Sequence, residues 1–118
     1  MTYFFEKLEI WQLSIDFSVE IYNVTIDFPS EEKFGVTNQI RRASNSVSAN
    51  IAEGSSRLGN KERARFYQIA YSSLMEVLSF LILSNRLNFL STSSFTDLRI
   101  RLEELSNKIN SYYKTIEL

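Results

Sequence analysis

Residues 94–117, SFTDLRIRLEELSNKINSYYKTIE, decide the fold class of this chain of 118 residues. Their apolar side chains recur at alternating intervals of three and four residues, which places them on one face of an α-helix. Such a helix needs other elements against which to bury that face. The stripe consists of Phe95, Leu98, Leu102, Leu105, Ile109, Tyr112 and Ile116.

Three further segments are helical in pattern, and one proline and three glycines are the only strong breakers in the chain. So few breakers favour long helices over a turn-rich β fold. Because the connections are short, consecutive helices should pack as antiparallel neighbours. We therefore predict an all-α fold, an antiparallel up-down-up-down four-helix bundle that forms one domain over residues 1–118. The expected helices span about 6–28, 36–53, 60–88 and 94–117.

Local signals set the expected helix ends. Pro29 should end the first helix, because proline disfavours helical geometry in the residue before it. Gly54 is the expected left-handed C-cap of the second helix, and Asn60 the expected N-cap of the third. Ser94 and Asp97 resemble a capping box at the start of the fourth.

The first predicted helix carries two apolar stripes. They are offset by two residues, which at roughly 100° per residue puts them on nearly opposite sides of the helix. A lone bundle buries one side of each helix, and a large exposed apolar patch usually marks an interface. We therefore expect a homo-oligomer, unless connections or termini cover the second stripe. One stripe is Leu8, Trp11, Ile15, Val19, Tyr22 and Ile26, and the other, ending at Phe28, contains the predicted interface residues Ile10, Leu13, Phe17, Ile21 and Val24.

The composition argues against catalysis. The chain has no histidine and no cysteine, so the usual nucleophile systems and zinc ligand sets cannot form. A metal site of carboxylates alone is conceivable, but its spacing requirements are unmet. We expect no enzyme activity, cofactor, metal or small-molecule substrate. The lack of cysteine, of a signal peptide and of a membrane-length apolar run predicts a cytoplasmic protein without a membrane partner.

The formal net charge of −1 conceals a basic middle segment. Residues 35–65 carry six basic and two acidic side chains, a net charge of +4. Basic side chains that repeat around an oligomer could bind the phosphates of RNA or DNA, and the alternative is a solvated surface with scattered ion pairs. The candidate nucleic-acid-binding residues are Arg41, Arg42, Arg57, Lys61 and Arg65.

Residues 42–54, RASNSVSANIAEG, followed by Arg57, resemble a family of small bacterial four-helix-bundle proteins. That family was first noticed as open reading frames in intervening sequences of 23S ribosomal RNA genes. Ser48 stands where relatives usually have proline. Strongly basic relatives, which include retroelement accessory proteins, are thought to hold nucleic acid, whereas this chain has a pI near 5.5. The resemblance implies a homopentameric ring without catalytic activity. It also implies structural roles for the motif residues Asn50, Glu53, Gly54, Arg57 and Glu76.

Two of these glutamates need partners. Glu53 lies in the last turn of the second helix, where the helix dipole disfavours negative charge, so we expect an ion pair with Arg57 or another arginine of helix 2 or 3. Glu76 interrupts an apolar run and is expected to pair with Arg42, Arg63 or a neighbouring subunit. The leading hypothesis is a homo-oligomer that binds structured RNA, and the alternative is a protein–protein scaffold.

Overall fold

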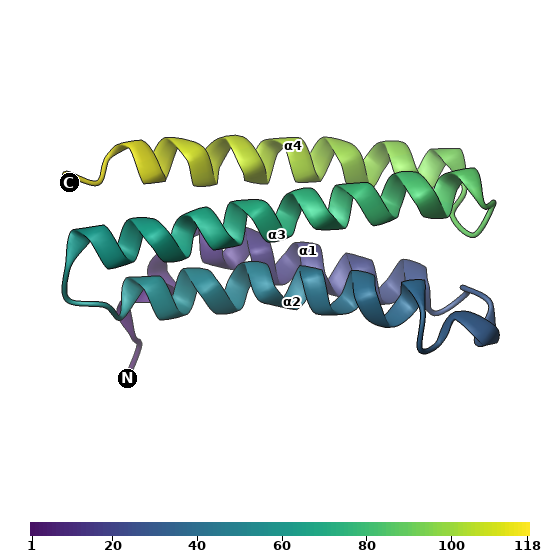
Figure 1. The fold of residues 1–118 in the computed structure, drawn as a ribbon, viewed down its shortest axis with the longest axis horizontal. Coiled ribbons are helices and arrows are strands. Elements are labelled where there is room, and N and C mark those ends of the chain that lie inside the picture. Colours follow the sequence, from purple (N-terminus) through teal and green to yellow (C-terminus); the bar gives the residue numbers. More distant parts are fainter.

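A computed structural model describes residues 1–118 and contains four long α-helices and two short 3-10 helices. Consecutive helices run in opposite directions along the long axis of the molecule (Figure 1). The predicted all-α, four-helix bundle is therefore confirmed. The elements are η1 (Phe4–Lys7), α1 (Glu9–Thr25), η2 (Ser30–Glu32), α2 (Val36–Ser55), α3 (Asn60–Arg86) and α4 (Thr92–Lys114).

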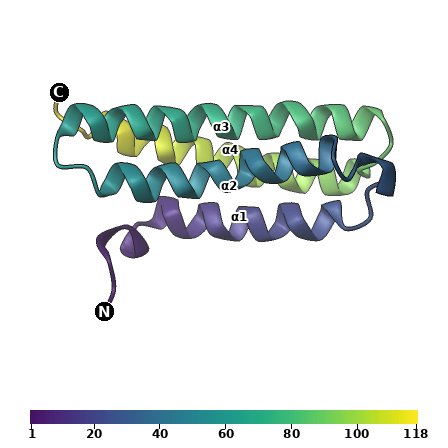
Figure 2. The same ribbon diagram turned by 60° about the horizontal axis from the view of Figure 1, so that its bottom comes forward.

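The four helices surround one core. α1 packs against α2, α2 against α3, α3 against α4, and α4 against α1, while the diagonal pairs are not in contact. Figure 2 shows η1 at the end of the bundle where α2 passes into α3. The bundle measures 43 × 24 × 22 Å. It is elongated because the four helices lie side by side along its long axis.

The predicted stripe of α4 faces this core. Leu98, Leu102, Leu105 and Ile109 are all at most 3% exposed. The residues at the ends of the stripe are partly buried and pack against the core cluster. A single period of 3.6 residues was therefore sufficient to identify the buried face of this helix.

The structure reverses the expected roles of the two stripes of α1. Ile10, Phe17 and Ile21 are only 4%, 3% and 0% exposed, and Leu13 and Val24 pack partly buried against the core. The prediction that these five residues form an oligomer interface is therefore wrong, because they are the inner face of α1. The exposed apolar stripe is the other one.

Small hydroxyl side chains explain this orientation. Ser14 and Thr25 are buried and donate to the carbonyls of Ile10 and Ile21, at 2.6 and 2.7 Å. Ser18 is also buried, and its hydroxyl lies 2.7 Å from that of Ser44 in α2. Satisfied hydroxyls can enter a core at little cost. The inner face therefore includes this serine and threonine strip, which rotates the second apolar stripe out of the core.

Three predicted caps are wrong. Gly54 does not adopt a positive φ, and α2 continues past it. Gly59, not Asn60, is the N-cap of α3. The N-cap of α4 is Ser91, not Ser94, because the Ser91 hydroxyl accepts a hydrogen bond from the Ser94 amide at 3.1 Å, and the helix begins two residues earlier than expected.

α3 contains a long apolar stretch. By length and composition alone it could cross a membrane, since an 18-residue window has a mean hydropathy of 1.4. Its inner side chains, among them Leu74, Val77 and Leu81, are fully buried in the bundle. A core helix of a helical bundle meets the same criterion, and the fold accounts for much of this apolar character.

Candidate nucleic-acid interface and outer apolar stripe

The exposed apolar residues of α1 form a surface beside α2. Asn45 Nδ2 donates to the hydroxyl of Tyr22 at 2.8 Å, and the Arg41 guanidinium lies 4.6 Å from the centre of the Tyr22 ring. The other apolar side chains of this stripe between Ile15 and Ile26 also remain partly exposed. We define the outer stripe as Ile15, Val19, Tyr22 and Ile26, which are 36%, 52%, 40% and 71% exposed.

The structure separates the five candidate nucleic-acid-binding residues into two groups. Arg41 and Arg42 lie near the start of α2, about 22 Å along the helix from Arg57. Arg41 is held against α1, since its Nε donates to Thr25 Oγ1 at 2.9 Å. Arg42 is exposed and belongs to none of the four ion pairs.

Two arginines at the α2–α3 turn are paired with glutamates. Arg57 Nη2 lies 3.1 Å from Glu53 Oε1, so the predicted ion pair is confirmed. Arg65 Nε lies 2.7 Å from Glu62 Oε2, and its hydrogen bond lowers the pKa of the Glu62 carboxyl. All four side chains are about half exposed. Such pairs contribute little to stability, but they neutralise part of the charge at this turn.

The same two arginines cover Phe66. Each guanidinium carbon lies 4.7 Å from the centre of its ring, and Phe66 is only 7% exposed. Cation–π contact and burial of the side-chain stems hold both arginines on this ring. Arg57 and Arg65 are therefore structural elements of the turn as well as surface cations. The spacing of basic residues along the sequence does not show that Phe66 lies beneath two of them.

Gly54 permits the close approach of α2 and α3 at this turn. A Cβ atom on Gly54 would lie 2.7 Å from Phe66 Cβ and 3.2 Å from Tyr67 Cε1. Real Cβ atoms do not come that close to a carbon fixed to the backbone. The glycine of the motif is thus explained by packing, not by a left-handed cap.

The other two polar motif residues differ in their contacts. Asn50 Nδ2 donates to the carbonyl and the hydroxyl oxygens of Ser46, at 2.7 and 2.9 Å, and the Ser46 hydroxyl contacts that of Ser73 in α3. Glu76 is exposed and forms no ion pair within the chain. The expected pairing of Glu76 with Arg42 or Arg63 is wrong, because Glu76 lies on the outer face of α3.

Two cations at the turn have no carboxylate partner. Lys61 is exposed and unpaired. Arg63, which the sequence analysis did not include among the binding residues, donates from Nε to the Arg57 carbonyl at 2.8 Å and from Nη1 to Asn60 Oδ1 at 2.9 Å. Neither acceptor is charged. Lys61 and Arg63 therefore carry the free positive charge of this turn.

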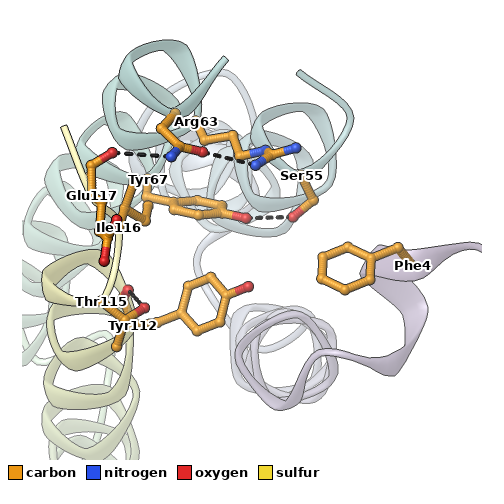
Figure 3. Close-up of a pocket in the computed structure, with 9 residues that line it drawn as sticks. Phe4, Ser55, Arg63, Tyr67, Tyr112, Thr115, Ile116 and Glu117 are labelled. Atoms are coloured by element: carbon orange, nitrogen blue, oxygen red, sulfur yellow. Dashed lines mark hydrogen bonds between the residues drawn. The ribbon is translucent and has the colours of Figure 1, made fainter. Parts of the chain in front are cut away.

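A cleft of about 580 Å³ lies beside Arg63 (Figure 3). Tyr67 rests edge-on against Tyr112 with ring centres 5.4 Å apart, and its hydroxyl lies 2.6 Å from Ser55 Oγ. Burial raises the pKa of the Tyr67 phenol above its ordinary value of 10.0, and the hydrogen bond with Ser55 acts in the opposite direction. Phe4 stands on the far side of the cleft (Figure 3). No group of three acidic residues gathers where it could hold a metal ion.

Comparisons with known proteins agree with this fold. A crystal structure of a protein of unknown function from the S23 ribosomal protein family of Bacteroides thetaiotaomicron superposes with a TM-score of 0.81. The two are 22% identical, and the match covers 90% of this chain and 99% of that one. No curated protein matches the sequence.

The family model of the 23S rRNA-intervening sequence protein matches residues 6–111. Because that match spans nearly the whole bundle, the chain belongs to the 23S rRNA-intervening sequence protein family.

Proposed function

We propose that this chain is a non-catalytic homo-oligomer that binds structured RNA through the α2–α3 turn. The observation that carries the assembly is the outer stripe of α1, four apolar side chains that the folded chain leaves partly exposed. Burying them against a second copy would remove further apolar surface from water, which is the main driving force for association.

The proposed assembly is a closed ring of copies. A pentamer of 13.8-kDa chains would have a mass of about 69 kDa. We expect light scattering to give a multiple of the chain mass, and Val19→Lys to shift it towards the monomer. Asn107→Lys is the matched control, because it adds the same charge to an exposed polar position on α4, outside the outer stripe. A wild-type protein that is monomeric at every concentration would refute the assembly.

The single tryptophan provides a second readout of assembly. Trp11 is half buried at one end of the outer stripe, and its ring meets that of Phe5 edge-on at 5.1 Å. A neighbour on the stripe would cover its exposed edge. Dilution should therefore shift Trp11 emission to longer wavelength in the wild-type protein, and the shift should be absent in Val19→Lys.

The proposed RNA contact uses Lys61 and Arg63. Neither is neutralised by a carboxylate, they lie within one turn at the start of α3, and the family description links such proteins to ribosomal RNA genes. Each phosphate contact contributes about −0.9 to the slope of log affinity against log salt. Two contacts for each bound subunit therefore predict a slope of about −2.

The RNA proposal is tested with a labelled RNA hairpin titrated at several salt concentrations. Lys61→Ala should weaken binding and reduce the steepness of the salt dependence by about one for each subunit engaged. Arg86→Ala is the control, because it removes an exposed cation from the opposite end of the same helix. An intact oligomer that binds no RNA at low salt would show this half of the proposal to be wrong.

Most of the basic residues predicted to bind nucleic acid are held by contacts within the chain, which favours a second candidate function. Arg57 and Arg65 are held by glutamates and by Phe66, and Arg41 is held against α1. If these contacts are their whole role, the chain is a protein–protein scaffold. That function predicts assembly through the outer stripe and no salt-dependent binding of RNA, so the two titrations above separate it from the first.

A further inference from the structure

The cleft beside the α2–α3 turn has aromatic walls contributed by distant parts of the chain. Phe4 comes from η1, Tyr67 from α3 and Tyr112 from α4, and Figure 3 shows Phe4 on one side and the two tyrosines on the other. Tyr67 is only 2% exposed, so the ring surface open to a ligand comes from Phe4 and Tyr112. Phe4 is 60% exposed and forms no aromatic pair within the chain. The volume of about 580 Å³ falls in the range typical of small-ligand sites.

The edge of the cleft is polar, with Arg63 as its one cation and Glu117 as its one acidic residue, and the two form no ion pair. The Arg63 guanidinium is oriented by two neutral acceptors, the Arg57 carbonyl and Asn60 Oδ1. Asn60 in turn donates to the carbonyl of Glu117 at 3.0 Å, which fixes the C-terminal segment along the outer end. A cation held in position by neutral groups keeps its full charge for an anion.

We propose that this cleft takes the base of one unpaired ribonucleotide, with the adjoining phosphate held by Arg63. Aromatic side chains can stack on any planar ring. A guanidinium that no carboxylate neutralises, at the edge of the cleft, favours a ligand whose ring is attached to an anionic group. A nucleotide has both a planar base and a phosphate. The proposal rests on the RNA-binding function proposed above, and it names the part of the RNA that the turn recognises.

The cleft has room for a base only when that base is unpaired. Lys61 is exposed and unpaired two residues before Arg63, but this offset turns it to nearly the opposite side of α3, so it is a separate phosphate contact outside the cleft. Single-stranded loops present unstacked bases, whereas a paired stem keeps its bases inside. The cleft should therefore distinguish an RNA loop from an RNA duplex.

Phe4 offers the cleanest test, because it is exposed and no core residue depends on its ring. The probes are an RNA hairpin with an unpaired loop and the same stem as a blunt duplex. Phe4→Ala should weaken hairpin binding by about 5- to 150-fold, the effect of losing one base–aromatic stack. Duplex binding and the salt slope should stay unchanged, since the ring carries no charge. Phe34→Ala is the matched control, as it removes an 86% exposed ring near the start of α2.

Arg63→Gln tests the phosphate contact separately. It should weaken hairpin binding and also reduce the steepness of the salt dependence by about one for each subunit engaged. Circular dichroism must show the helical content of both variants unchanged. If Phe4→Ala binds the hairpin as tightly as Phe34→Ala does, the cleft does not hold a base and only this inference falls. If the wild-type oligomer binds neither probe at low salt, the inference and the RNA-binding function both fall.

Discussion

Replacing Gly54 by alanine tests the packing that shapes the α2–α3 turn. The new Cβ would lie 2.7 Å from Phe66 Cβ, 3.2 Å from Tyr67 Cε1 and 3.4 Å from the Arg63 carbonyl. Phe66 Cβ is bonded directly to the backbone and cannot rotate away. The two helices must therefore separate by several tenths of an ångström at the point where they support the arginines and the tyrosine cleft.

Two opposing terms set the magnitude of the Gly54→Ala effect. Overpacking of a tight interface costs about 1–3 kcal/mol. Alanine is favoured over glycine inside a helix by about 1 kcal/mol, and Gly54 does lie inside α2. The net expectation is a loss of about 1 kcal/mol (range about 0–2) in the free energy of unfolding, or a decrease of roughly 3–6 °C in Tm for a domain of this size.

The assay is urea and thermal unfolding followed by circular dichroism at one fixed protein concentration, because assembly makes stability depend on concentration. Gly59→Ala is the matched control, since a Cβ there meets no atom within 4 Å and the backbone is extended, with φ −97° and ψ 144°. It should change stability by no more than about 0.5 kcal/mol. A Gly54→Ala protein more stable than the wild type by the full helix-propensity gain of about 1 kcal/mol would refute the close-approach argument.

Further predictions concern the polar contacts. Glu53→Gln removes the half-exposed ion pair with Arg57 and should cost at most about 0.5 kcal/mol in urea unfolding, whereas Glu76→Gln, which breaks no ion pair, should cost nothing measurable. Tyr67→Phe removes the hydrogen bond between the Tyr67 and Ser55 hydroxyls and should cost about 1 kcal/mol. Because the folded pKa of Tyr67 is raised, its neutral form stabilises the fold below pH 10 and that stability is lost as pH rises through the folded pKa. Alkaline unfolding curves should therefore be flatter for Tyr67→Phe than for the wild type, and identical curves would contradict the assignment.

The sequence predicted the helices well and their orientation less well. Periodicity gave the core face of α4 directly, because that helix has one apolar stripe. On α1 it gave two stripes and the angle between them, but not which stripe faces inward. Ser14, Ser18 and Thr25 decide that question, since their hydroxyls are satisfied by a carbonyl or by Ser44 and can be buried. Such pairing depends on the neighbouring helix and is not visible in a hydrophobic pattern.

The candidate site shows the same division between local and distant contacts. The Glu53–Arg57 pair joins residues four apart and could be predicted from spacing alone. The cleft could not, because Phe4, Tyr67 and Tyr112 come from three elements that meet only in the folded bundle. Charge counts also grouped basic residues by sequence spacing, which overlooked the aromatic ring that holds some of them.

The contacts of the family motif limit where RNA could bind. Asn50 donates to Ser46 within α2, Gly54 admits Phe66, and Glu53 holds Arg57 on that ring. These roles are internal to the bundle, so all the motif residues except the exposed Glu76 are explained without any ligand. Support for RNA binding must then come from cations whose charge no carboxylate neutralises. At this turn they are the cations that follow the motif on α3, and they lie beside a cleft of the right chemistry for a base. Variants of the motif should therefore act mainly on stability, and variants of Lys61 and Arg63 mainly on binding.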